Sequence, residues 1–147
     1  MKKIITFTII LLVLTSMILL VGCSGAQYND GVYEGKSSVH EGDDDGGDGY
    51  GVVTITIKDN KITECVFKTY ETDGTEKDED YGKQNGEIAN RDFYNRAQRA
   101  LRANSTYASA LVLYNALNKV DVVSGATISH DEFVEAVTDA LNKAKKQ

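Results

Sequence analysis

Residues 52–61 read VVTITIKDNK, and this short stretch predicts a β-hairpin. Every second side chain is aliphatic, as in a strand with one buried face, formed here by Val53, Ile55 and Ile57. Asp59 and Asn60 then predict a two-residue turn, because both residue types tolerate positive φ better than most. The apolar segment 61–70 follows as the second strand of an antiparallel pair.

The segments on either side of the hairpin complete the predicted fold. Upstream, residues 30–35 read DGVYEG, which indicates a first strand with glycines at its ends. Downstream, from Arg91, apolar residues recur at helical spacing. Asn104 and Ser105 are expected to break the first helix and to cap a second, which ends near Asn118. The fold class is therefore α+β: a small antiparallel sheet packed against C-terminal helices.

Three apolar stripes are expected to face the sheet. They consist of Phe93, Ala97, Ala100 and Leu101 in the first helix, Leu111, Tyr114 and Leu117 in the second, and Phe133, Val137, Ala140, Leu141 and Ala144 in the last. Two polar segments interrupt this scaffold. Residues 41–49 predict a solvated loop, because their acidic spacing does not fit an EF-hand, and no metal site is predicted. Residues 71–90 predict an exposed loop that orders in part over a cofactor or a partner.

The N-terminus predicts export and lipid anchoring. Lys2 and Lys3 precede an uncharged apolar run, residues 4–21, that leads directly to Cys23. This pattern resembles the lipobox of bacterial lipoproteins, although a run of this length could also remain as an uncleaved anchor helix. The predicted organisation is a signal peptide over residues 1–22, a tether over 23–29 that begins at lipidated Cys23, and one domain over 30–147. The acyl chains, palmitate among them, would hold the chain at the extracytoplasmic face of the cell membrane.

Charge and cysteine content narrow the function further. The chain is acidic, with a net charge of −6, and removal of the signal peptide would take away Lys2 and Lys3. Such a domain is unsuited to nucleic acid and to electrostatic binding of anionic lipid. With Cys23 lipidated, Cys65 has no partner for an intramolecular disulfide. Its apolar neighbours favour a buried structural cysteine over a redox thiol.

Residues 121–127, which read DVVSGAT, contain the strongest functional signal. Gly125 and Ala126 leave room for a large group to approach the backbone, and Thr127 offers a hydroxyl for esterification. Ser129 and Glu132 fit a capping box, so a helix is expected to begin at about His130. Thr127 would then precede a helix N-terminus, which favours an anion. The alternative is that the segment is only a strand-to-helix turn.

The motif resembles Asp-x-x-[Ser/Thr]-Gly-Ala-[Ser/Thr] of the FMN-binding domain family, in which a flavin transferase attaches FMN to threonine through a phosphoester. Residues 30–35, 49–51 and 58–63 are similar to the opening of such domains. The resemblance implies covalent FMN on Thr127, within a binding loop that also includes Ser124, Gly125 and Ala126. It also implies that the transferase, with FAD as FMN donor, recognises Asp121. The alternative role for Asp121 is to stabilise a turn.

The resemblance also suggests which side chains surround the flavin. The proposed neighbours of the ring are Tyr50, Leu111 and Tyr114. His130 could contact the flavin or its phosphate, or it could lie in the cap region and point to solvent. The arginines of the first helix form a solvated face, or one of them contacts the flavin or a redox partner: Arg91, Arg96, Arg99 and Arg102.

The function implied is that of an extracytoplasmic electron carrier. It would relay electrons from a quinone-linked or NADH-linked membrane donor to an external acceptor. No catalytic residues are predicted, so an electron-transfer flavoprotein is favoured over a stand-alone enzyme. A subunit of an Rnf- or Nqr-type complex is a close variant. Two alternatives of other classes are a flavin-free surface lipoprotein that binds a ligand or partner, and a flavin reductase domain.

Overall fold

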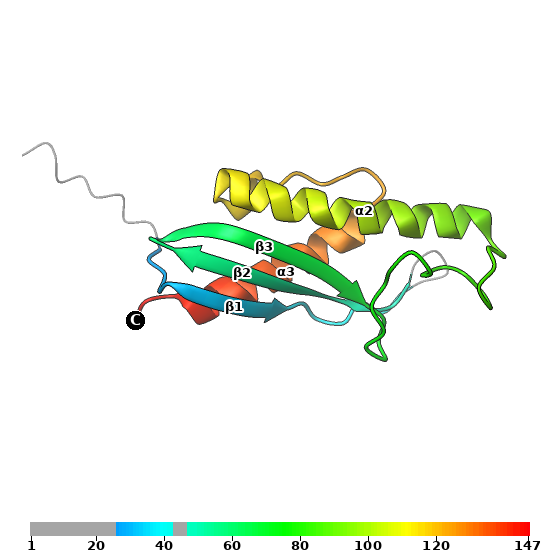
Figure 1. The fold of residues 1–147 in the computed structure, drawn as a ribbon, viewed down its shortest axis with the longest axis horizontal. Coiled ribbons are helices and arrows are strands. Elements are labelled where there is room, and N and C mark those ends of the chain that lie inside the picture. Colours follow the sequence, from blue (N-terminus) through cyan, green and yellow to red (C-terminus); the bar gives the residue numbers. More distant parts are fainter. Residues whose placement is uncertain (1–25, 43–46) are drawn as a thin grey trace, which may run out of the picture.

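The computed structural model describes residues 26–42 and 47–147. Its strands form one antiparallel sheet in the order β1-β2-β3. The elements follow one another as β1 (Gly31–Lys36), β2 (Tyr50–Lys58), β3 (Lys61–Tyr70), α2 (Arg91–Tyr114), the short 3-10 helix η2 (Leu117–Lys119) and α3 (Thr127–Ala144). Both long helices lie on the same face of the sheet, where α3 packs on β1 and β2 and α2 packs on β3 (Figure 1). The predicted α+β class is confirmed.

The hairpin forms as its sequence predicts. Asp59 and Asn60 both have positive φ, 51° and 61°, which is the conformation of a type I′ turn and matches the twist of the strands. Val53, Ile55 and Ile57 are at most 2% exposed, while Thr54 on the other face is exposed. A bulge shifts the pairing beside the turn, so that Thr56 pairs with Glu64 but Ile57 pairs with Ile62.

The core lies between the sheet and the helices, as the stripe of α3 predicts. Phe133, Val137, Ala140 and Ala144 are fully buried, and Leu141 packs at the edge of the core. The rings of Phe67 and Phe133 meet edge to face with centroids 5.0 Å apart. Strand β1 approaches α3 so closely that a Cβ on Gly35 would collide with the backbone oxygen of Ala136. Only glycine fits at this crossing.

The predicted break at Asn104 and Ser105 is wrong, because α2 runs unbroken from Arg91 to Tyr114. The Asn104 side chain is directed away from the helix backbone, and its amide nitrogen lies 3.3 Å from the hydroxyl oxygen of Thr69 on β3. Asn104 is only 6% exposed. Packing against the sheet therefore overrides the local preference of asparagine for a cap.

The end of α2 also differs from the prediction. Asn115 adopts a left-handed conformation and its backbone N–H donates to the Leu111 carbonyl, which closes the helix. The Asn115 side chain accepts from the Ile62 N–H at 2.6 Å and donates to the Ile62 carbonyl at 3.1 Å. Tyr114 consequently lies outside the core, with 55% of its surface exposed. The second predicted helix is the last part of α2 followed by η2.

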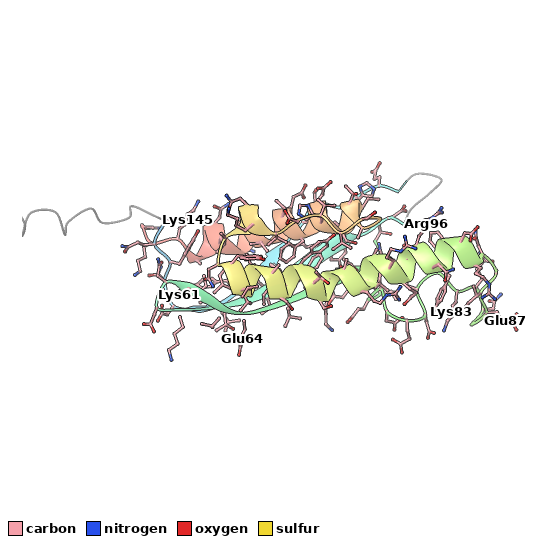
Figure 2. The ribbon with its side chains drawn as sticks, turned by 90° about the horizontal axis from the view of Figure 1, so that it is seen from above. Lys61, Glu64, Lys83, Glu87, Arg96 and Lys145 are labelled. Carbon is pink, nitrogen blue, oxygen red and sulfur yellow. The ribbon has the colours of Figure 1, made fainter. Side chains whose placement is uncertain are left out.

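The two ends of the described chain lie together. The Asn29 N–H donates to the Ala144 carbonyl and the Lys146 N–H donates to the Gln27 carbonyl, so the chain enters the domain beside the end of α3. Figure 2 shows Lys145 at this end, with Lys61 of the hairpin beside it. No helix within the described residues is long and apolar enough to span a membrane. Cys23 and the predicted signal peptide lie outside the described residues.

Candidate functional site

The loop before α3 is a tight turn. The Ala126 N–H donates to the Val123 carbonyl at 3.0 Å, which places Ser124 and Gly125 at the centre of a four-residue turn. Gly125 has a φ of 79°, the value that a type II turn requires at its third position. The segment is therefore a tight connection into the helix as well as a candidate attachment site, and glycine at position 125 adopts the positive φ of the turn without strain.

Tyr107 of α2 forms hydrogen bonds with both ends of this turn. Its hydroxyl accepts from the Val123 N–H at 3.1 Å and donates to the Ala126 carbonyl at 3.0 Å. Tyr107 is completely buried. The sequence analysis did not identify it, although a tyrosine four residues before a core leucine, Leu111, must find a polar partner for its hydroxyl when it is buried.

Helix α3 begins at Thr127, which corrects the predicted start at about His130. The expected capping box does not form, because Ser129 and Glu132 lie inside the first turns and their side chains are buried against the domain. The N-cap residue is Ala126, which makes no side-chain hydrogen bond. The first backbone N–H groups of α3 are therefore left without a side-chain cap, beside the exposed Thr127, and this is an arrangement that favours an anion.

A cavity of about 280 Å³ opens between the start of α3 and the first half of α2. Its walls are mainly apolar and include Phe93, Ala97, Ala100, Leu101, Ala126 and Ile128. Thr127 lies at the edge of the cavity together with Gly125. The stripe that was expected to be core in the first half of α2 thus lines this cavity, and only Ala97 of its four residues is buried.

Charged residues lie inside the cavity as well. Glu132 is 5% exposed, and its Oε1 atom is buried without a hydrogen-bond partner. Burial raises the pKa of Glu132, and the nearby positive charge of Lys77 opposes this shift. Burial lowers the pKa of Lys77, and the negative charge of Glu132 is the largest opposing influence. The two groups therefore interact electrostatically in a partly desolvated space.

The segment between β3 and α2, residues 71–90, lies in part against the cavity, while its ordering over a cofactor or a partner stays a prediction. It supplies Lys77 and Tyr81 to the lining. The Gln98 side chain of α2 donates to the carbonyls of Asp78 and Tyr81 at 3.0 and 3.1 Å, and so fixes the segment to the helix. Burial raises the pKa of Tyr81 to about 12, so this phenol is neutral at ordinary pH.

The other predicted site residues are divided between this site and the rest of the domain. Ser124 and Asp121 are exposed on the loop that leads to Thr127, and neither lines the cavity. Of the four arginines, Arg96 lines the cavity, and a Cβ on Gly125 would lie 3.5 Å from the Arg99 side chain. Arg96 and Arg99 thus place positive charge near the turn, where a phosphate would be attracted.

The proposed ring neighbours Tyr50, Leu111 and Tyr114 do not line the cavity. Tyr50 stacks on Tyr70 at 5.5 Å, Leu111 is fully buried in the core, and Tyr114 lies at the far end of α2. The three residues therefore lie away from this cavity, which borders the first half of α2, and their role as neighbours of the ring stays a prediction.

His130 does not point to solvent, and its contact with the flavin or its phosphate stays a prediction. It does not line the cavity, and its side chain is only 14% exposed instead of pointing to solvent. Its Nε2 atom lies 3.0 Å from the Val120 carbonyl, and its ring meets the Tyr107 ring edge to face. His130 therefore contacts the start of the loop before α3, at Val120, while Tyr107 contacts the end of that loop, at Val123 and Ala126.

Cys65 does not line the cavity, whereas the acidic segment 41–49 contributes Gly47 to its lining. Cys65 is half-buried at the edge of the core, and burial raises the pKa of its thiol to about 12, as expected for a structural cysteine. Residues 43–46 of the acidic loop lie outside the described residues. Among the described residues, no cluster of His, Cys, Asp or Glu is arranged to hold a metal ion.

Comparison with known protein families shows which family the chain belongs to. The profile of the FMN-binding domain family matches residues 46–142. The chain belongs to this family. Membership confirms the resemblance inferred from the motif and supports FMN as the cofactor of this FMN-binding domain.

A solved structure supports the fold of the FMN-binding domain. The crystal structure of the CPE2226 protein from Clostridium perfringens matches with a TM-score of 0.58 and 22% sequence identity. The match covers 80% of this chain and 89% of that one. At this identity the likeness concerns the fold alone. No curated protein matches the chain.

The residues around the cavity fit FMN. Uncapped N–H groups at the start of α3 suit its phosphate, the positive φ of Gly125 brings the backbone close to that group, and apolar walls suit a planar ring. The unpaired Oε1 atom of Glu132 offers a buried acceptor. This FMN-binding domain therefore offers groups that suit the phosphate and the ring of the cofactor.

Removing the Tyr107 hydroxyl tests how the site is held. We expect Tyr107→Phe to lower the free energy of unfolding by about 2 kcal/mol, because the Val123 N–H and the Ala126 carbonyl lose their buried partner. Flavin loading should fall as the turn loosens. Urea unfolding measures the first effect and the flavin-to-protein absorbance ratio the second. Tyr33→Phe, which removes a hydroxyl bonded to the Asn29 carbonyl, is the control for loading.

Proposed function

We propose that this protein is an extracytoplasmic electron carrier with FMN joined through its phosphate to Thr127. The observation that carries the proposal is the position of Thr127, exposed as the first residue of α3 and at the edge of an apolar cavity. A phosphoester formed there would lie against the uncapped N–H groups of the helix. The flavin ring would be within reach of the cavity.

Attachment of the cofactor requires a flavin transferase, which we propose uses FAD. The Thr127 oxygen attacks the FMN phosphorus, the pyrophosphate bond of FAD breaks, AMP leaves, and the hydroxyl proton is lost. Asp121 and Ser124 are exposed on the same loop and are accessible to a second protein. In this proposal Asp121 is recognised by the transferase, while Gly125 and Ala126 allow its close approach.

The folded chain then positions the cofactor and leaves it accessible. FMN supplies one- and two-electron transfer, and the protein supplies its environment. Phe93, Leu101 and Ile128 offer apolar contacts for a ring, and Arg96 places positive charge beside it. Attachment through a phosphoester would keep the cofactor from diffusing away outside the cytoplasm.

We further propose that Cys23 carries the lipid anchor that follows cleavage of residues 1–22. The described chain enters the domain beside the end of α3, and α3 extends about 25 Å from Ala144 to Thr127 at 1.5 Å per residue. The flavin would therefore be presented at the end of α3 away from the tether. A quinone-linked or NADH-linked membrane protein would supply electrons, and an external acceptor would receive them.

The intact mass of residues 24–147, produced with and without a flavin transferase, tests this proposal. We expect a gain of one FMN less one water, located on the peptide that contains Thr127, only when the transferase is present. If a folded protein gains no mass beside an active transferase, the covalent carrier is excluded. A surface lipoprotein that binds a ligand or partner without flavin would then be the better account.

A further inference from the structure

The cavity beside Thr127 has a few buried polar groups within a mainly apolar lining. Glu132, Lys77 and Thr69 supply polar atoms, and both Glu132 and Thr69 are at most 5% exposed. The remaining lining is mostly aliphatic or aromatic. A buried carboxylate oxygen without a partner is costly, so a retained Glu132 calls for a ligand group that donates to it.

We propose that Glu132 and Lys77 receive the polar edge of the flavin ring and so set its orientation in the cavity. This inference rests on the proposed function. The pyrimidine part of the ring presents one imide N–H between two carbonyls. The carboxylate of Glu132 accepts from the N–H, and the ammonium of Lys77 donates to a carbonyl. One acceptor beside one cationic donor complements that edge.

The spacing along α3 agrees with this assignment. Glu132 follows Thr127 by five residues, a rise of about 7.5 Å along the helix axis. The phosphate would lie at the N-terminus of the helix, and the ribityl chain would extend along it toward Glu132. The apolar dimethylbenzene edge of the ring would then face the exposed side of the cavity, near Ile128 and Phe93. Electrons would enter and leave by that edge.

The charged groups around Glu132 and Lys77 are of both signs. Lys77 is a positive neighbour of the Glu132 carboxylate, whereas Glu135 is a negative one. Lys77 itself is influenced by Glu132, Glu71 and Asp48. The pair therefore places one negative and one positive group beside the ring. The negative group should lower the reduction potential of the flavin, and the positive group should raise it.

The test uses protein loaded on Thr127, with loading verified by intact mass. We expect Glu132→Gln to raise the midpoint potential of the flavin, because a negative charge that opposes reduction is removed. Lys77→Gln should lower it. Glu64→Gln makes the same charge change as Glu132→Gln, on the outer face of β3 and away from α3 (Figure 2), and should leave the potential unchanged. Equal potentials in the wild type and both cavity variants would overturn the inference.

A second measurement separates this inference from the proposed function. Free riboflavin is titrated into protein made without transferase, and its fluorescence quenching gives the affinity. We expect Glu132→Leu to bind about tenfold more weakly than the wild type, because the imide N–H loses its acceptor. Absence of flavin on Thr127 in the mass experiment would reject covalent attachment only. Equal riboflavin affinity in the wild type and Glu132→Leu would reject the role of Glu132, whatever the mass result.

Discussion

Thr127→Val is expected to abolish flavin attachment while the domain remains folded. Valine has nearly the shape of threonine but carries no hydroxyl, so no phosphoester can form at the start of α3. Thr127 is exposed and its side chain makes no capping hydrogen bond, so the free energy of unfolding should change by no more than about 0.5 kcal/mol. Intact mass and visible absorbance after co-expression with a transferase measure the loss. Thermal unfolding measures the fold.

Two further variants make this result specific. Thr127→Ser keeps a hydroxyl at the same position and should still gain flavin. Thr138→Val removes a hydroxyl elsewhere on α3, one that donates to the Val134 carbonyl, and should also load fully. If Thr127→Val gained the mass of FMN, attachment at another residue would have to replace the proposal. Loss of electron transfer in Thr127→Val alone would link the cofactor to function.

The sheet and the last helix could be predicted from the sequence because their signals are local. The alternation before Asp59 and the positive φ values at Asp59 and Asn60 specify the hairpin without help from distant residues. The stripe from Phe133 to Ala144 repeats at helical spacing and is buried as predicted. The family motif was equally readable, since it occupies consecutive residues.

Errors arose where distant contacts overrule local preference. Asparagine has a local preference for helix ends. At Asn104 the helix nevertheless continues, because the side chain is buried at the interface with the sheet and forms a hydrogen bond with Thr69. Glu132 was assigned to a capping box, but the turn held by Tyr107 starts the helix earlier and leaves Glu132 in the cavity. Spacing alone does not reveal which half of α2 borders that cavity. Tyr114 was wrongly assigned to a core stripe, because it is the last residue of α2 and 55% of its surface is exposed.

Cys23→Ala is expected to block lipidation and processing together. The wild-type chain should lose residues 1–22 and carry acyl chains on Cys23, because the lipobox pattern places this cysteine directly after the cleaved bond. The variant should keep its full length and gain no lipid. Intact mass of the protein extracted from membranes distinguishes the two forms. Cys65→Ala, which removes the other cysteine, should be processed normally.

The same experiment decides between the two readings of the apolar run. If the wild type were recovered at full length and without lipid, residues 4–21 would be an uncleaved anchor helix. A third protein, residues 24–147 exported behind a signal peptide that is cleaved without lipidation, should leave the membrane fraction and still gain flavin beside an exported transferase. Acyl chains contribute about 0.8 kcal/mol of membrane binding per buried CH₂, and the acidic domain offers no electrostatic substitute. Anchoring and flavin attachment would thus be separable, since Cys23 and Thr127 belong to opposite ends of the mature chain.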